Sequence, residues 1–287
     1  MKRSGGKWNL LATYRTILPP ASEFTGVNDV CVGGGALFLG LCPLTRPATL
    51  NDCSVELITT YRAVRDDAAG VMAALDRHHA RFVAAAKISL EAYRGVYYAL
   101  RAIRPESLPP VEMAARMIAL NKTTFNGLYR QNQAGVFNAP CGGQVHIDGT
   151  IHVPSFYKAE NMRRLALAFD GVTFTTVDLV KAIDAAKAGE VVFADVPYEP
   201  LKEGGFVAYD GAGFTWEDQV RTARALERAA DRGCYVVAMN HDLATVRQLY
   251  KRWTIHVVNA QRSTSSVGAD RGLKPELLMI LDGRSTR

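Results

Sequence analysis

The sequence of 287 residues lacks CxxC pairs, long apolar runs, internal repeats and low-complexity linkers. Its five cysteines are odd in number and scattered, which argues against a disulfide framework or a zinc site and predicts buried, reduced thiols without a metal ion. No apolar run approaches the roughly 18 residues that a membrane span needs. The basic start, MKRSGGKWNLL, has no small-residue cleavage site, so we expect an unprocessed cytoplasmic protein without membrane contact.

The composition is that of a globular chain with a surplus of positive charge. Hydrophobic residues make up 48% of the sequence, enough to bury one large core or two moderate ones, so we expect one domain with an insertion. The net charge of +6 weakly favours a polyanionic partner, although many basic proteins bind no nucleic acid.

Short β-rich runs alternate with segments of helical periodicity, a pattern that predicts an α/β sheet wound on both faces. The last two runs are separated only by a polar loop, so we expect them to form an antiparallel hairpin at one edge. The predicted strands are 27–32, 48–52, 172–178, 191–196, 234–240, 254–260 and 276–282. The predicted helices between them include 54–67, 159–169, 179–188, 215–232 and 242–252.

Residues 72–158 interrupt this alternation. They begin with helical segments at 72–103 and 111–121 and continue into a long polar stretch rich in Asn and Gly. Irregular segments of that length are usually functional or disordered. We therefore expect 72–158 to be an inserted, mostly helical recognition subdomain, and 1–71 with 159–287 to form the main domain.

The ends of the first two predicted strands suggest a nucleoside site. The first ends at Asp29 and is followed by glycines, among them Gly33 and Gly35, which would let the backbone approach a ligand or simply make a tight turn. The second ends at Asp52, where a carboxylate suits a ribose diol. Because the glycines do not fit G-x-G-x-x-G, a dinucleotide is poorly supported and S-adenosylmethionine is the obvious candidate.

Carboxylates also end the next two predicted strands. Asp178 could contact a ligand or cap the helix that follows it. Asp195 begins the sequence DVPY at the end of a predicted buried strand. A strand that served only the core would not need a carboxylate, a proline and a tyrosine at its end. The alternative for DVPY is a strand-terminating turn with a capping Asp and a packing Tyr.

These motifs, in this order, resemble the Dam-type DNA adenine-N6 methyltransferases over almost the whole chain. KRSGGKWNLL is similar to the family's K-W-A-G-G-K segment, DVCVGGGALF to E-P-F-x-G-x-G, and DVPY to D-P-P-Y, while NDCSVELITTYRAVRD resembles its ribose-binding segment. FNGLYRQNQAGVFNAPCG resembles the target-recognition region, and FVAYDGAGFTWEDQ, MNHD and QRSTSS follow in family order. The resemblance implies a Rossmann-like methyltransferase sheet, S-adenosylmethionine as methyl donor and double-stranded DNA as partner. It also places Lys7 and Trp8 in the donor-binding segment.

The resemblance further implies how DVPY would act. Asp195 and the backbone carbonyl of Val196 would accept the two amino hydrogens of adenine, which localises the lone pair on N6. Val196 keeps that carbonyl although the family has proline there, and Pro197 still stiffens the turn. Tyr198 would stack on an adenine rotated out of the duplex. The methyl group would then move directly to the nitrogen, so the protein contributes positioning and electrostatics.

Several departures from the family pattern support an alternative, a catalytically silent relative that binds DNA. Arg3 stands where the family usually has tryptophan, and Val30 and Cys31 replace Pro-Phe. Val196 replaces the first proline of D-P-P-Y. A further departure, the lack of the usual basic and aromatic residues in CGGQVHIDGTIHVP, bears on the recognition sequence instead. The retained Asp195, Pro197 and Tyr198 argue against this alternative.

Polar residues of the recognition segment are candidate DNA contacts. Arg130 could read guanine or hold a phosphate, and Lys122 could neutralise a phosphate. Asn126 and Asn132 could contact DNA or brace the loop. Phe125 is more typical of a core residue than of a base wedge.

Two further basic residues, Arg262 and Arg271, lie in the loop between the last two strands and suit phosphate contacts. His241 is more typical of a loop-bracing residue than of a catalytic base.

We expect the protein to act as a monomer on a short specific sequence, alone or beside a restriction enzyme.

Overall fold

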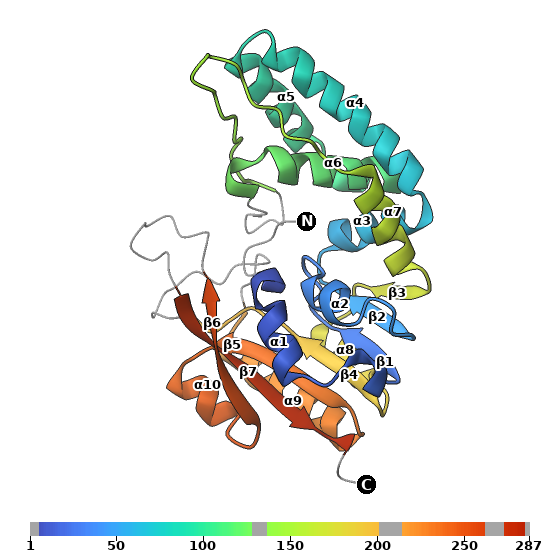
Figure 1. Cartoon of the computed structure of the whole chain (residues 1–287), viewed down its shortest axis with the longest axis vertical. Coiled ribbons are helices and arrows are strands. Elements are labelled where there is room, and N and C mark those ends of the chain that lie inside the picture. Colours follow the sequence, from blue (N-terminus) through green and yellow to red (C-terminus); the bar gives the residue numbers. More distant parts are fainter. Residues whose placement is uncertain (1–5, 128–136, 201–213, 262–272, 285–287) are drawn as a thin grey trace. The chain divides into compact units, whose positions relative to one another are not determined.

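The computed structural model describes residues 6–127, 137–200, 214–261 and 273–284 (Figure 1). It divides into two compact units. The helical unit contains Ser54–Asp170, and the sheet unit contains Gly5–Cys53 and Gly171–Arg287. The expected insertion, 72–158, thus falls within the helical unit, which also takes in 54–71 and 159–170. The roles predicted for the two parts stay predictions.

The described strands of the sheet unit form one seven-stranded sheet of order β3-β2-β1-β4-β5-β7-β6. β1 to β5 pair in parallel with one another, and the strand order reverses between β1 and β4. In such sheets ligands bind beyond the carboxyl ends of the strands at this switch point. The strands are β1 (Gly26–Asp29), β2 (Ala48–Asn51), β3 (Val172–Thr175), β4 (Glu190–Ala194), β5 (Tyr235–His241), β6 (Thr254–Gln261) and β7 (Leu273–Asp282).

The last two strands confirm the expected antiparallel hairpin at one edge of the sheet. β7 pairs antiparallel with both β5 and β6, and β6 is the edge strand. Because β7 runs against β5, its first residues lie beside the carboxyl end of β5. The register places Glu276 opposite His241, the last residue of β5.

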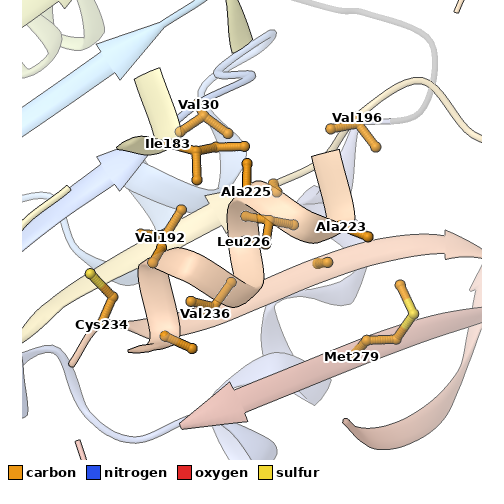
Figure 2. Close-up of a cluster of buried hydrophobic side chains, with 14 of the residues drawn as sticks. Val30, Ile183, Val192, Val196, Ala223, Ala225, Leu226, Cys234, Val236 and Met279 are labelled. Carbon is orange, nitrogen blue, oxygen red and sulfur yellow. The ribbon is translucent and has the colours of Figure 1, made fainter. Parts of the chain in front are cut away.

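Helices cover both faces of this sheet, as the α/β pattern predicts (Figure 1). Alternate side chains of the strands face the helices of one layer, where Ile183, Val192, Leu226, Val236 and Met279 share a buried cluster (Figure 2). α9 begins with a capping box between its first-turn acid and the preceding threonine. The helices of this unit are α1 (Leu11–Ile17), α2 (Ala36–Leu41), α8 (Leu179–Asp184), α9 (Trp216–Asp231) and α10 (Ala244–Leu249).

The helical unit has its own core, in which Val71, Leu75, Phe82, Tyr97 and Leu120 are buried together. The expected helical stretch 72–103 is divided in the structure, because a serine at 89 caps a new helix. The helices of this unit are α3 (Val55–Asp66), α4 (Ala68–Ala86), α5 (Leu90–Ala102), α6 (Pro110–Thr123) and α7 (Ala159–Phe169).

A buried ion pair joins two of these helices. Arg116 of α6 is 2% exposed, and its Nη1 lies 2.6 Å from Oε1 of Glu56 on α3. The same guanidinium donates to the carbonyls of Leu100 and Arg101 at the end of α5. Three helices of the unit therefore meet at one charged side chain.

Arg116→Met is expected to lower the free energy of unfolding of the helical unit by about 3–5 kcal/mol, because it removes the guanidinium that neutralises the buried Glu56 carboxylate. Chemical denaturation followed by circular dichroism measures this change. Arg77→Met is the matched control, since Arg77 pairs with Glu112 on exposed helix surface, where loss of the pair costs about 0–1 kcal/mol. Equal losses in the two variants would contradict the role assigned to Arg116.

The cysteines only partly follow the sequence expectation. Cys42, Cys141 and Cys234 are buried, as predicted, and all five are free thiols. Cys53 is exposed and Cys31 is partly exposed, so the expectation of burial is wrong for these two. Cys53 lies where the chain leaves β2 for the capping residue of α3, and this turn is at the surface. Within the described ranges no group of side chains could hold a metal ion, and no helix has the length and apolar character to cross a bilayer.

Candidate active site

The carboxyl edge of the sheet collects most of the predicted site residues. Asp29 is the last residue of β1, Asp52 directly follows β2, and Asp195 directly follows β4. β1 and β4 are neighbours at the switch point, with β2 on the other side of β1. The fold therefore brings three carboxylates from distant parts of the chain to one edge of the sheet unit.

The turn after β1 adopts a conformation that requires glycine. Gly33 and Gly35 have φ angles of 47° and 74°, in the left-handed region that other residues rarely adopt. The backbone N–H of Gly33 donates to Oδ2 of Asp52 at 3.0 Å. Asn51 donates from its amide to the carbonyl of Val30 at 3.1 Å. These bonds tie the β1 turn to the end of β2, so the two strand ends form one preorganised cradle.

Asp29 is the most unusual carboxylate of this edge. Its side chain is 1% exposed, and neither oxygen makes a hydrogen bond of normal geometry to a described residue. Burial raises the pKa of Asp29 to about 8, and the nearby negative charge of Asp195 adds to the rise. The backbone N–H groups of Cys31 and Phe38 oppose it. A buried acid with unsatisfied oxygens is costly in isolation, which points to a cationic or hydrogen-bonding ligand.

Asp195 is paired with a buried lysine. Nζ of Lys7, from the 3-10 helix Lys7–Leu10, lies 3.0 Å from Oδ1 of Asp195 and 3.7 Å from Oε2 of Glu276. Burial raises the pKa of Asp195, and the Lys7 ammonium opposes this rise. The ion pair therefore favours the ionised carboxylate, the form that accepts hydrogen bonds.

Tyr198 is held on three sides. Its hydroxyl donates to Oε2 of Glu276 at 3.0 Å, and its ring meets the ring of His241 edge-on with centroids 4.9 Å apart. Nζ of Lys7 lies over the ring, 4.6 Å from its centroid. Burial raises the pKa of Tyr198 well above its ordinary value, so the hydroxyl stays a donor.

The backbone of the same segment is braced by buried amides. Nε2 of Gln219 on α9 donates to the carbonyl of Pro197 at 2.8 Å, and Nδ2 of Asn240 donates to Oε1 of Gln219 at 3.1 Å. Oδ1 of Asn240 accepts from the N–H of Glu199 at 3.0 Å. Nδ1 of His241 lies 2.7 Å from the carbonyl of Glu199, in keeping with the loop-bracing role expected of this histidine. Three of these hydrogen bonds fix the turn that carries the predicted catalytic residues, and the bond between Asn240 and Gln219 holds two of its partners in place.

The side chain and the backbone carbonyl of Val196 have separate roles, the first in packing and the second in the predicted contact with adenine. Its side chain is buried in the cluster that also holds Ala223 and Leu226, and Figure 2 shows it at one end of that cluster. An apolar side chain at this position therefore contributes packing, and the carbonyl predicted to accept an adenine hydrogen belongs to every residue type.

Two predicted donor-binding residues have other surroundings. Trp8 is 51% exposed beside the buried Lys7. Asp178 caps α8, where its Oδ1 accepts from the N–H of Val180 at 2.9 Å, and it forms a 3.4 Å ion pair with Arg221. These contacts fit the capping alternative for Asp178.

The predicted DNA contacts are only partly described. Lys122 and Asn126 are exposed, and Asn126 has a φ of 56°. Phe125 is 52% exposed, so its expected place in a core is wrong: it begins a short turn after α6, where its ring is not covered. The remaining candidates, Arg130, Asn132, Arg262 and Arg271, lie outside the described residues, as does Arg3.

Glu276 and Gln219 were not predicted, yet both contact the DVPY segment. A sequence signal for Glu276 existed: an acid at the start of an antiparallel last strand lies at the carboxyl edge of its parallel neighbours. Gln219 is the last residue of FVAYDGAGFTWEDQ, the segment that resembles the family after the catalytic motif, but a glutamine in the first turn of an amphipathic helix is usually exposed and was given no role.

Comparisons with known proteins agree with this geometry. Residues 4–264 match the family model of the D12 class N6 adenine-specific DNA methyltransferases. The chain belongs to this family. It is 30% identical to Type II methyltransferase M1.LlaDCHI of Lactococcus lactis subsp. cremoris, over 97% of this chain and 93% of the relative. It is also 30% identical to the DNA adenine methylase of Escherichia coli (strain K12), over 98% of this chain and 94% of the relative.

The family assignment confirms the resemblance expected from the sequence. A further DNA adenine methylase, from Vibrio cholerae serotype O1, is 28% identical over 98% of this chain and 94% of the relative. This methyltransferase is thus an enzyme that transfers a methyl group from S-adenosylmethionine to N6 of adenine in DNA. The seven-stranded sheet with its antiparallel hairpin bears out the expected methyltransferase fold.

Proposed function

We propose that the segment Asp195-Val196-Pro197-Tyr198 holds and polarises an adenine rotated out of duplex DNA. The observation that supports this most directly is the placement of a partly buried carboxylate and an aromatic ring together at the end of β4, on a turn braced by Gln219 and Asn240. Rigid support of this kind keeps reacting groups within the narrow range of productive geometry.

In this proposal Asp195 accepts one hydrogen of the adenine amino group, and the backbone carbonyl of Val196 accepts the other. The two acceptors favour a pyramidal N6 with a localised lone pair, which makes a delocalised amine nucleophilic. Tyr198 stacks on the base, and stacking worth about 1–3 kcal/mol helps offset unpairing. After transfer the methylated amino group loses a proton to water, so no side chain need act as a strong base.

The cradle beside β1 fits the methyl donor. S-adenosylmethionine carries its methyl group on a sulfonium, and it also has an ammonium and a ribose diol. We assign the ammonium to the unsatisfied carboxylate of Asp29 and the ribose to Asp52, with Gly33 and Gly35 allowing close approach of the backbone. Trp8 and Asp178 are weaker candidates, because one is exposed and the other already caps α8.

We propose that the helical unit contributes target recognition. Lys122 and Asn126 are exposed near the end of α6, and the exposed ring of Phe125 suits a wedge between bases better than a core. Arg130 and Asn132 follow in the sequence, and Arg262 with Arg271 would add phosphate contacts from the sheet unit. A single chain supplies all of these groups, so we propose a monomer as the active form.

Nucleoside mass spectrometry of unmethylated duplex DNA, incubated with the protein and S-adenosylmethionine, tests the proposal. N6-methyladenine is the expected product, and sequencing of the methylated DNA then gives the recognition site. Tyr198→Ala is expected to reduce this product by about 10²-fold, because a stacked base is lost. A wild-type yield of N6-methyladenine from Tyr198→Ala would contradict the role proposed for this ring.

A further inference from the structure

Glu276 lies in the site although no motif marks it. It is 7% exposed on β7, and the antiparallel direction of that strand brings it to the carboxyl edge, opposite His241. Oε2 of Glu276 accepts the Tyr198 hydroxyl at 3.0 Å and lies 3.7 Å from Nζ of Lys7. One carboxylate oxygen thus faces both the aromatic ring and the cation of the site.

Lys7 is shared between two carboxylates and one ring. Its Nζ lies closer to Asp195 than to Glu276, at 3.0 Å against 3.7 Å, and 4.6 Å from the centroid of the Tyr198 ring. The ammonium therefore faces Tyr198 and binds Asp195, the two groups that the proposed function assigns to adenine. An adenine stacked on this ring and bonded to this carboxylate would compete with the ammonium for the same partners.

We propose that Glu276 is a positioning residue of the base pocket, which fixes the Tyr198 ring through its hydroxyl and receives the Lys7 ammonium when adenine takes Asp195. The inference rests on the proposed function of Asp195 and Tyr198. It also moves Lys7 from donor binding to the base side of the site, since its closest carboxylate is that of Asp195.

Physical chemistry supports the transfer of Lys7 from one carboxylate to the other. A buried ammonium without a counter-ion is strongly unfavourable. Lys7 therefore leaves Asp195 readily only if a second carboxylate lies close enough to replace it. Nζ of Lys7 has to move less than about 1 Å toward Oε2 of Glu276 to form a close ion pair. The exchange keeps the cation neutralised and leaves Asp195 ionised with a free lone pair for the adenine amino group. Without the Glu276 charge, Lys7 would stay on Asp195 and oppose entry of the base.

Glu276→Gln is the discriminating variant, because the amide oxygen still accepts the Tyr198 hydroxyl and only the charge is lost. We expect kcat to fall about 10²-fold, since base entry is opposed. The Kd of S-adenosylmethionine and the KM for DNA should stay within about twofold, because neither ligand is held by Glu276 outside the base pocket. The fluorescence rise of a duplex with 2-aminopurine at the target position, which reports the flipped base, should be largely lost.

Glu190→Gln is the matched control. Glu190 is also a buried strand carboxylate, but it begins β4 at the opposite edge of the sheet and accepts from Asn28 and from the N–H of Lys187. This variant should change the melting temperature without changing kcat or the 2-aminopurine signal. If Glu276→Gln does not fold, Glu276→Asp, which keeps the charge on a shorter side chain, takes its place and should retain more activity than any neutral variant that folds.

A double-mutant cycle separates the charge of Glu276 from general packing. In a Lys7→Met background no ammonium has to leave Asp195, so Glu276→Gln should cost less than about threefold in kcat. An unchanged 10²-fold cost in that background, or wild-type flipping and kcat in Glu276→Gln alone, would overturn the inference. Failure of the proposed function looks different: full methylation by Asp195→Ala would refute it whatever the result at Glu276.

Discussion

Asp195→Ala is expected to lower kcat for adenine methylation by about 10³-fold while S-adenosylmethionine still binds. The carboxylate directly follows β4 and is the charged acceptor proposed for the adenine amino group. Removal of a preorganised hydrogen-bond partner of the reacting atom typically costs about 10²–10³-fold. The substitution also removes the nearer of the two carboxylates that face Lys7, which adds to the defect. Single-turnover methylation of a duplex that carries the recognition site measures the chemical step directly.

Two controls make the result at Asp195 interpretable. Asp195→Asn retains an acceptor oxygen but loses the charge, so its kcat should lie between those of the wild type and Asp195→Ala. Asp184→Ala removes an exposed carboxylate of α8 that pairs with Arg228, and it should leave kcat unchanged. Methylation by Asp195→Ala at more than about a tenth of the wild-type rate would refute the role assigned to this residue.

Asp29→Asn is expected to weaken S-adenosylmethionine binding by about 10²-fold. The variant keeps the shape of the side chain but removes the charge proposed to hold the donor ammonium, and charge-assisted hydrogen bonds in a buried site contribute about this much. Isothermal titration calorimetry without DNA measures the effect apart from catalysis. Adenosine, which shares the ribose but has no ammonium, should bind the wild type and the variant equally. An unchanged affinity for S-adenosylmethionine in Asp29→Asn would contradict the proposal that Asp29 binds the donor.

The same residue predicts a pH dependence. Because burial raises the pKa of Asp29 to about 8, the carboxylate of the unliganded protein is largely protonated at pH 7. Donor affinity should rise with pH toward about 8, approaching tenfold per pH unit on the acid side. It should fall again above the pKa of the donor's own amino group, about 7.7–8.0. In Asp29→Asn the rise of donor affinity on the acid side should disappear, and the fall on the alkaline side should remain.

The raised pKa also sets the sign of a stability effect. The folded protein holds the Asp29 proton more tightly than the unfolded chain, whose carboxyl has the ordinary value of 3.8. The stability from this proton is fully present below pH 3.8 and is lost as pH rises to about 8. The side chain of Asp29→Asn does not ionise. The melting temperature of this variant should therefore rise relative to that of the wild type as pH increases across this range. A constant difference between the two proteins would show that Asp29 ionises freely in the fold.

Most of the sheet could be predicted from the sequence, because each strand is a short apolar run that ends in a polar or small residue. The run from Val191 to Ala194 is an example: it is buried, it is followed by Asp195, and it lies within the sheet as the alternation of strands and helices predicts. The antiparallel hairpin was predictable for a similar reason, since no helix separates its two strands. Site residues at strand ends follow from these assignments alone.

What could not be predicted depends on side chains that meet only after folding. The sharing of Lys7 between Asp195 and Glu276 joins three parts of the chain, and no local pattern marks it. Phe125 was expected in a core because aromatic residues usually are buried, but a turn after α6 leaves it uncovered. The buried Gln219 breaks the rule that glutamines of amphipathic helices face water, and it does so because Pro197 and Asn240 offer it partners.

The position of Val196 has a consequence for natural variation in this family. Its side chain belongs to the packed interior, and the role proposed for the residue needs only its main-chain carbonyl, so we expect side-chain volume and polarity to decide which residue types this position accepts. We expect apolar residues of similar size to replace one another there without a change in the chemistry, the proline of the family motif among them. Departure from a signature sequence at such a site is therefore poor grounds for judging an enzyme inactive.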